Sequence, residues 1–183
     1  MLKNTRDGYG SVSKFFHWLV FLLVVTMFII AYVMDELPDS PLKGQMYGLH
    51  KSIGLTVLGV MILRLLWKLS NVRVADIPGT RWWERVAERS VHFALYLLLI
   101  AMPLSGWIMS TAAGRAPNFF GLGVVPLPGI AHDRDFAHQV AEVHEYIAYF
   151  ILALVSLHIL AALWHHFIKH DAVLRRMMPK KHA

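Results

Sequence analysis

The chain has 183 residues, of which 56% are hydrophobic and only 16% charged, and its mean hydropathy is +0.48. This is too little charge for an ordinary soluble domain and indicates a membrane protein. The net charge of +6 does not point to a nucleic-acid partner, because the basic residues gather at the ends of apolar runs. The lack of cysteine excludes disulfides, cysteine-ligated iron–sulfur clusters and covalent haem attachment through a CxxCH motif.

Four long apolar runs account for the hydrophobic excess, and they cover residues 15–34, 49–67, 91–111 and 143–167. Each is close to the ~20 residues with which a helix crosses ~30 Å of hydrocarbon. A spanning segment must satisfy its own backbone hydrogen bonds, so each run is expected to be a helix. The sequence therefore predicts an all-α integral membrane four-helix bundle, with residues 1–183 as one domain. The first run is interpreted as a retained helix, because it is longer than the apolar part of a signal peptide.

The basic residues are distributed unevenly between the two ends of this predicted bundle. One side carries most of them: Lys3, Arg6, Lys14, Arg64, Lys68, Arg73, Arg81, Arg85, Arg89, Lys169, Arg175, Arg176, Lys180 and Lys181. The other side keeps only Lys43, Lys51, Arg115 and Arg134. The positive-inside rule then predicts that both termini lie in the cytoplasm. Basic ends of this kind also favour contact with anionic membrane lipid.

The segments between the runs differ in character. Residues 35–48 contain two prolines and two glycines and are expected to form a turn. Residues 68–90 include two tryptophans and spaced arginines, which suit an amphipathic segment at the membrane interface, continuous with the third helix. Residues 112–142 are apolar but broken by proline and glycine, so a cap on the outer side is predicted there rather than a fifth span.

Two histidines in the last apolar run carry the functional argument. His144 and His158 are fourteen residues apart, so an ideal helix places them ~21 Å apart in height and about 40° short of four full turns. They should therefore lie on nearly one face at two depths of the membrane. A polar side chain at such depths is costly unless it is paired or ligated. The fourth helix is thus predicted to form a wall shared by two stacked sites.

Each of these sites needs a second ligand at a matching depth. His50 suits the outer level, whereas the inner level could take either His17 or His92, and residue counting leaves that choice open. Neutral imidazoles are axial ligands of haem iron, and helix bundles commonly hold cofactors between facing helices. The pattern therefore predicts two bis-histidine haems. The rival interpretation is a metal transporter that uses its histidines directly. Against it, the four apolar runs lack the buried carboxylates that are expected along the path of a hard cation.

Several stretches resemble the bacterial cytochrome b561 family. They are KFFHWLVFLLV around His17, YGLHKSIGLTVLGVMILRLL around His50, VHFALYLLLIAMPLSGWIM around His92, VHEYIAYFILALVSLHILAALWHHF across the fourth run, and the tail LRRMMPKK. The resemblance covers nearly the whole chain, although the outer loops match poorly. It implies two haem b groups in a bacterial inner membrane. It also implies that His17 and His158 hold the inner haem iron, and that His50 and His144 hold the outer one.

The same resemblance implies that superoxide is oxidised at the periplasmic face and ubiquinone is reduced at the inner side. Superoxide is a small anion, so Lys51 and Arg115 are the candidates for steering it. Quinone reduction consumes protons, and the candidates near the inner haem are His165, His92 and Arg64. An alternative is a haem-b membrane anchor that accepts electrons from a periplasmic dehydrogenase. Membrane lipid is an expected partner, and the resemblance does not require a protein partner.

Overall fold

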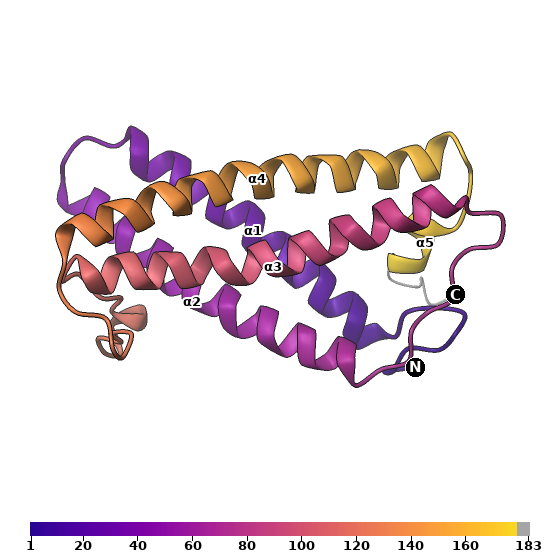
Figure 1. Ribbon diagram of the computed structural model, residues 1–183, viewed down its shortest axis with the longest axis horizontal. Coiled ribbons are helices and arrows are strands. Elements are labelled where there is room, and N and C mark those ends of the chain that lie inside the picture. Colours follow the sequence, from indigo (N-terminus) through magenta and orange to yellow (C-terminus); the bar gives the residue numbers. More distant parts are fainter. Residues whose placement is uncertain (179–183) are drawn as a thin grey trace.

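The computed structural model describes residues 1–178 and is built almost entirely of helices (Figure 1). The four long ones are α1 (Ser11–Glu36), α2 (Pro41–Leu69), α3 (Trp82–Ala112) and α4 (Arg134–Phe167). Two short ones are the 3-10 helix η1 (Phe119–Gly121) and α5 (Val173–Met177). Residues 1–178 contain no β-strand, only a single bridge between Asn118 and Val124. The predicted all-helical fold is confirmed.

The helices are longer than the apolar runs that predicted them. The Ser40 hydroxyl accepts from the Lys43 N–H at the start of α2, where Pro41 occupies the first turn, so the predicted turn 35–48 is much shorter than expected. The Asp133 carboxylate accepts from the Phe136 N–H and begins α4 well before the apolar run. Hydropathy follows the hydrocarbon thickness, whereas capping groups determine where a helix begins.

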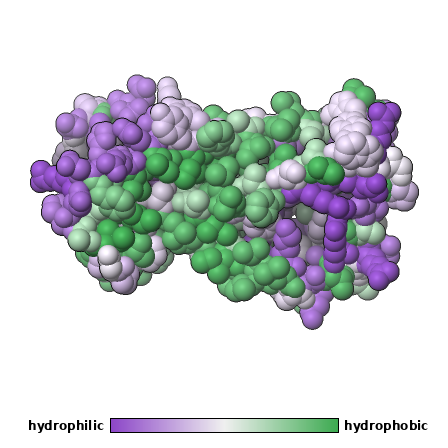
Figure 2. All heavy atoms as spheres, viewed as in Figure 1, coloured by the Kyte–Doolittle hydropathy of each residue, from purple (hydrophilic) through white to green (hydrophobic). Residues whose placement is uncertain are grey.

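The surface of the bundle is that of a membrane protein. All four long helices are long and apolar enough to cross a membrane. Figure 2 shows hydrophobic side chains across the middle of the molecule and hydrophilic ones gathered toward both ends. Many large apolar side chains in this middle band are exposed, including Leu22, Leu63 and Leu97. A band of this kind is stable only against lipid, because a soluble protein rarely exposes so large a contiguous apolar surface.

The long helices are not equally close to one another. Close packing joins α1 to α2, α2 to α3, and α3 to α4, around a core that includes Val20, Met61, Leu99 and Ile151. Within residues 1–178, neither α1 nor α2 packs extensively against α4. The backbones of α1 and α2 therefore lie farther from α4 than the backbone of α3 does.

Both described ends of the chain lie at the same end of the bundle (Figure 1). The Lys14 ammonium donates to the Met178 carbonyl at 2.8 Å, and the Trp18 indole N–H donates to the Met177 carbonyl at 3.0 Å. The connection between α2 and α3 reaches the same end, because the Ala75 N–H donates to the Arg6 carbonyl. The basic residues expected on one side are thus gathered there, except Lys180 and Lys181, which lie outside the described residues.

The loop between α3 and α4 forms a cap over the opposite end of the bundle. The Ser52 hydroxyl, almost fully buried on α2, accepts from the Phe120 N–H at 3.0 Å and lies 3.2 Å from the Asn118 carbonyl. The Trp107 indole N–H donates to the Val125 carbonyl and attaches the loop to α3. The loop contains η1 and no membrane-spanning helix, as the sequence predicted.

Candidate functional site

Two pairs of imidazole rings face each other inside the bundle, at two levels of α4. At the end where the N-terminal segment and α5 lie, His17 of α1 faces His158 of α4 with ring centres 6.1 Å apart. At the other level, His50 of α2 faces His144 of α4 with ring centres 6.4 Å apart. Both pairs bridge helices that do not pack extensively against each other. We call them the inner pair and the outer pair.

His92 of α3 also approaches the inner pair but in a different setting. Its ring centre lies 5.2 Å from that of His158, and its Nδ1 lies 3.9 Å from a carboxylate oxygen of Glu88. The contact between His92 and His158 joins α3 and α4, which pack closely against each other. The close packing leaves less room for a flat cofactor between His92 and His158 than between His17 and His158.

The ring separations suit a metal ion between the imidazoles of each pair. A first-row metal ion lies about 2 Å from the nitrogen of an imidazole ligand. Because the ring centre lies about 1 Å beyond that nitrogen, two imidazoles on opposite sides of one ion have centres roughly 6 Å apart. The inner and outer pairs have this separation, whereas the His92–His158 distance is shorter.

The set of donor atoms distinguishes a haem from a bare metal ion. Within residues 1–178, no group of three or more histidine, aspartate or glutamate side chains is arranged to hold a metal ion. Each pair thus supplies two nitrogens, the number that haem iron takes from the protein along its axis, since the macrocycle supplies the others. A bare transition-metal ion would need more protein ligands. The residues present therefore fit haem.

The surroundings of the outer pair hold its two rings differently. The Ser105 hydroxyl donates to the Met102 carbonyl at 2.8 Å, so it accepts from the Nδ1–H of His144 at 2.9 Å. This hydrogen bond leaves the Nε2 lone pair of His144 free to bind a metal ion. The Nδ1 of His50 is buried without a hydrogen-bond partner among the described residues. Burying such an atom without a partner costs free energy, so His50 stands apart from the other buried polar side chains that the structure describes.

Gly106 also belongs to the outer site, and the sequence analysis missed both it and Ser105. A Cβ atom at position 106 would lie 3.1 Å from Cε1 of His144, closer than ordinary packing allows. Glycine therefore lets the imidazole lie directly against α3. A glycine inside a helix, where it is unfavourable, was the only signal in the sequence. It could not show which side chain fills the space.

Arg64, a sequence candidate for the quinone side, lies beside the inner pair. Its Nη2 is 3.1 Å from Nδ1 of His17, and its guanidinium lies 5.3 Å from the ring centre of Tyr96. The Lys68 ammonium lies over the same tyrosine ring at 4.4 Å. Arg64 thus lies beside the inner pair, and Lys68 shares its contact with the Tyr96 ring.

Lys51 and Arg115, the candidates for steering an anion, are brought together at the outer end. The Lys51 ammonium donates to the Arg115 carbonyl at 2.8 Å and so attaches the loop to α2 next to His50. The Arg115 side chain is exposed, and no carboxylate forms an ion pair with either residue within 1–178. The end of the bundle next to His50 therefore carries two cationic side chains.

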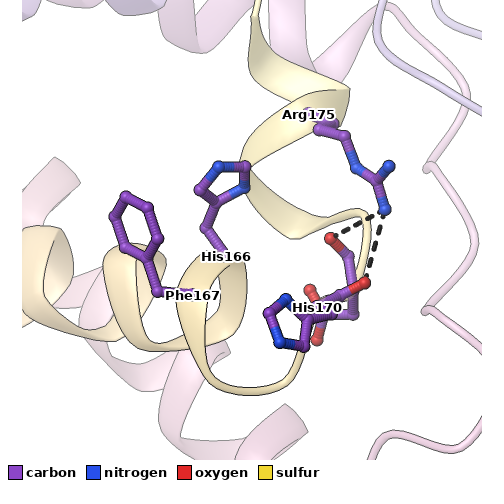
Figure 3. A pocket seen from close by; sticks show the side chains of 5 residues that line it. His166, Phe167, His170 and Arg175 are labelled. Carbon is purple, nitrogen blue, oxygen red and sulfur yellow. Dashed lines mark hydrogen bonds between the residues drawn. The ribbon is translucent and has the colours of Figure 1, made fainter.

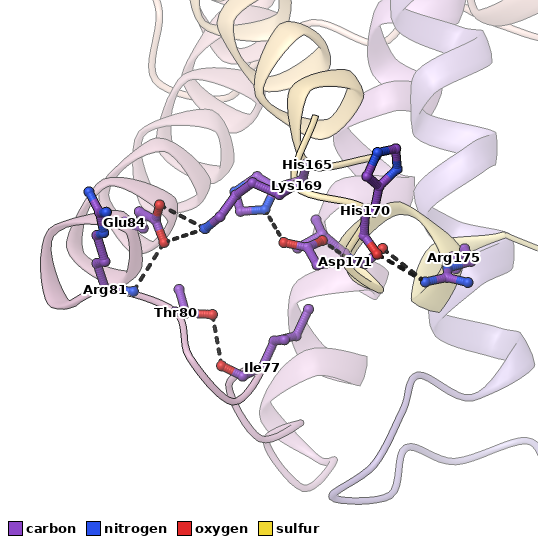
Figure 4. A network of polar contacts seen from close by, with 10 residues as sticks. Ile77, Thr80, Arg81, Glu84, His165, Lys169, His170, Asp171 and Arg175 are labelled. Atoms are coloured by element: carbon purple, nitrogen blue, oxygen red, sulfur yellow. Dashed lines mark hydrogen bonds and ion pairs between the residues drawn. The ribbon is translucent and has the colours of Figure 1, made fainter. Parts of the chain in front are cut away.

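His165 takes part in a polar network where α4 ends (Figure 4). Its Nδ1 lies 2.5 Å from a carboxylate oxygen of Asp171, while the Lys169 ammonium lies 2.8 Å from both carboxylate oxygens of Glu84. Burial opposes ionisation of Asp171, but the hydrogen bonds from His165 and from the Val173 N–H outweigh it and lower its pKa. This carboxylate is therefore ionised at neutral pH.

A small hollow lies on the outer surface of the same turn (Figure 3). Its volume is about 220 Å³, and His166, His170 and Arg175 are among the residues that line it. The Arg175 guanidinium donates to the carbonyls of His170 and Asp171 and closes the turn between α4 and α5. His166 and His170 thus belong to this turn and not to the inner pair.

Comparison with known proteins shows the family to which the chain belongs. The family described as prokaryotic cytochrome b561 matches residues 8–180. Cytochrome b561 homolog 2 of Escherichia coli (strain K12) is 36% identical over 97% of this chain and 94% of its own length. Cytochrome b561 homolog 1 of the same strain is 29% identical over 96% and 99%. A Yersinia pestis protein named probable superoxide oxidase CybB is 33% identical over 94% and 97%.

The match extends over the helices that carry both histidine pairs, and the residues of those pairs fit the cofactor of this family. Four apolar helices agree with a multi-pass bacterial membrane protein. The chain belongs to the prokaryotic cytochrome b561 family, whose members bind haem b and transfer electrons within the membrane.

Proposed function

We propose that this protein transfers electrons across the membrane by means of two haem b groups, oxidising superoxide at the outer face and reducing ubiquinone at the inner face. The observation that carries the proposal is the stacking of two histidine pairs along α4, with ring centres 6.1 Å and 6.4 Å apart. Both separations would suit two imidazoles that hold one iron ion between them. Two such pairs at two depths provide two cofactor positions between the faces of the membrane.

In this proposal His17 and His158 hold the inner haem, and His50 and His144 hold the outer one. Bound haem would supply reversible one-electron chemistry at each level. Ser105 orients His144 through its hydrogen bond, and Gly106 gives that ring its place against α3. His92 is assigned a place beside the inner pair and not a bond to iron.

We infer that the end carrying both termini faces the cytoplasm. The N-terminal segment, the α2–α3 connection and α5 all lie there and contain most of the arginine and lysine residues. The positive-inside rule associates such an end with the cytoplasmic face. The outer pair and the loop that covers it would then face the periplasm of a bacterial inner membrane.

The outer end has the charge that a reaction with superoxide requires. Superoxide gives up one electron and leaves as O₂, so no proton has to be delivered and no covalent bond is broken. Lys51 and Arg115 attract the anion to the side of the bundle where His50 and His144 lie. The relative from Yersinia pestis, named a probable superoxide oxidase, adds support for this donor.

The inner end has groups that can deliver protons to a quinone. One ubiquinone takes two electrons and two protons to become ubiquinol, so two superoxide ions are consumed for each quinone. His165 is held by the ionised Asp171 and can pass protons from the cytoplasm. Arg64 and His92 lie beside the inner pair and are further candidates for contact with the quinone carbonyls.

A second candidate function is that of a membrane anchor that accepts electrons from a periplasmic dehydrogenase. The observation in its favour is the apolar tip of the outer loop, where Phe120, Leu122 and Val124 are exposed at 52%, 85% and 64%. Such a tip could contact a protein partner or the membrane interface. Electron transfer that occurs only with a co-purified partner would favour this function over direct oxidation of superoxide.

The proposed function is tested on the purified protein in detergent. We expect two b-type haems per chain in a reduced-minus-oxidised spectrum. Superoxide should reduce them in stopped-flow mixing, and added ubiquinone should reoxidise them. One haem per chain would contradict the two-level arrangement. Two haems that superoxide leaves oxidised would contradict the donor while leaving the cytochrome assignment intact.

Neutralising the outer cation should slow the reaction with superoxide. For Arg115→Gln we expect the second-order rate of haem reduction to fall about tenfold at low ionic strength, because a local positive field concentrates the anion. High salt should reduce the difference from the parent protein. Arg134→Gln, which removes the same charge at the start of α4, serves as the control. Equal losses in both variants would show that net charge, and not this position, determines the rate.

A further inference from the structure

Three segments that are distant in the sequence meet at the basic end of the bundle. The Ala75 N–H donates to the Arg6 carbonyl at 2.8 Å, and the Arg176 guanidinium donates to the Ala75 carbonyl at 2.7 Å. The N-terminal segment, the connection between α2 and α3, and α5 are therefore joined at one point. This junction brings together arginines that local sequence gives no reason to associate.

A hollow of about 400 Å³ lies beside this junction. Among residues 1–178, its charged lining consists of Arg6, Arg73 and Arg89, with Asp76 as the only carboxylate. The volume is in the range of sites that hold small molecules. The hollow is separate from both histidine pairs, and none of the proposed redox chemistry uses its residues.

The charges that line the hollow do not balance. One carboxylate oxygen of Asp76 lies 2.8 Å from Arg89, and the other lies 3.6 Å from Arg73. Among residues 1–178, no carboxylate lies within ion-pair distance of Arg6. Each guanidinium has five N–H donors, and the side chains of Arg73 and Arg89 remain 68% and 53% exposed, so most donors stay available. The hollow thus has an excess of positive charge and of hydrogen-bond donors.

The Tyr9 phenol lies within the electrostatic influence of Arg73 and Arg176. Burial and the Glu88 carboxylate raise the pKa of Tyr9, and the opposing influence of Arg176 and Arg73 is smaller. The phenol is therefore neutral at physiological pH and does not compensate the arginines. An anion with several acceptor oxygens would, and phosphate matches the planar fork of arginine in this respect.

The position of the hollow relative to the membrane indicates where such a phosphate would come from. Arg89 stands two residues before the apolar run that starts at Val91. Trp82 and Trp83, exposed at 70% and 46%, begin the same helix, and exposed tryptophans are typical of the membrane–water interface. The hollow therefore lies at the level of lipid headgroups, next to the apolar part of α3.

We propose that this arginine hollow binds the phosphate headgroup of an anionic phospholipid, whose acyl chains lie along the adjacent apolar surface. Basic pockets beside membrane helices on the cytoplasmic side are suited to such headgroups. The bound lipid connects the N-terminal segment, the α2–α3 connection and α3. It should therefore stabilise the basic end of the bundle.

The experiment compares lipid retention by the purified haem-loaded protein. The protein is equilibrated with equal amounts of phosphatidylglycerol and phosphatidylcholine in detergent, recovered, and its bound lipid measured by mass spectrometry. We expect retention to favour phosphatidylglycerol, and the preference to fall about tenfold in the double variant Arg6→Gln/Arg73→Gln, because two phosphate contacts are lost. Arg85→Gln, which removes a charge from the same helix as Arg89 but outside the hollow, should keep the preference.

Two further arms keep the proposal open to refutation. Arg6→Gln alone removes a side chain with no polar partner among residues 1–178, so it should fold normally and still lower the preference. Inorganic phosphate at millimolar concentration should not displace the lipid. Displacement by free phosphate would assign the hollow to a soluble anion. Equal losses in Arg85→Gln and in the hollow variants would show attraction by general charge and overturn the site.

Discussion

Replacement of His158 by alanine is expected to remove the inner haem and to spare the outer one. The imidazole of His158 faces His17 at the inner level, 6.1 Å between ring centres, and alanine has no atom that can bind iron. Since the outer pair lies about four helical turns away along α4, its ligands should keep their places. The haem content should fall to about half, and one of two components should vanish from the redox titration.

Variants of the two possible partners complete this test. His17→Ala should disturb the same haem as His158→Ala, because both rings belong to the inner pair. His92→Ala should retain both haems, although its ring centre is only 5.2 Å from that of His158. Electron paramagnetic resonance of the ferric protein reports the low-spin signal of each bis-histidine haem. If His92→Ala loses a haem while His17→Ala keeps both, the inner ligands have been assigned wrongly.

Substitution of Gly106 by alanine is expected to weaken the outer haem selectively. The added methyl group would lie 3.1 Å from Cε1 of His144, and the ring has little freedom to move away because Ser105 holds its Nδ1. Overpacking of this kind costs about 1–3 kcal/mol, which corresponds to a loss of affinity for the outer haem of about fivefold to 150-fold. The measurement is the rate and extent of haem loss from each level on dilution in detergent.

Gly59→Ala provides a matched control on α2. It adds the same methyl group to a membrane-spanning helix, but no atom lies within 4 Å of the new carbon. Both substitutions improve helix propensity by about 1 kcal/mol, so a difference between them isolates the contact with His144. We expect Gly59→Ala to keep both haems. Equal behaviour of the two variants would mean that His144 tolerates a shift and that Gly106 has no special place at the outer site.

The membrane-spanning segments could be predicted from local features of the sequence. Apolar runs of about twenty residues indicate spans, since the bilayer fixes their length. The regular turn of a helix places His144 and His158 on one face at two depths. The helix ends were predicted less well, because Ser40 and Asp133 extend α2 and α4 through capping bonds outside the apolar runs.

Which residues lie beside each histidine could not be predicted from the sequence, because this depends on the distances between helices. Counting residues gave His17 and His92 similar depths, and only the packing shows that α3 lies close to α4 while α1 does not. The same packing turns Ser105 and Gly106 toward His144 and brings Arg64 to His17. None of these contacts leaves a periodic pattern in one segment of the chain.

The sequence by itself thus determined the membrane class, the number of spans and the two levels of histidine on α4, because hydropathy and helical periodicity act within one segment. The tertiary structure decided which rings face each other at a spacing suited to iron, which groups orient them, and how arginines from three segments gather at the basic end. These properties depend on how far apart the helices lie and how each is rotated about its axis, and both are set by the packing of side chains from all four helices together.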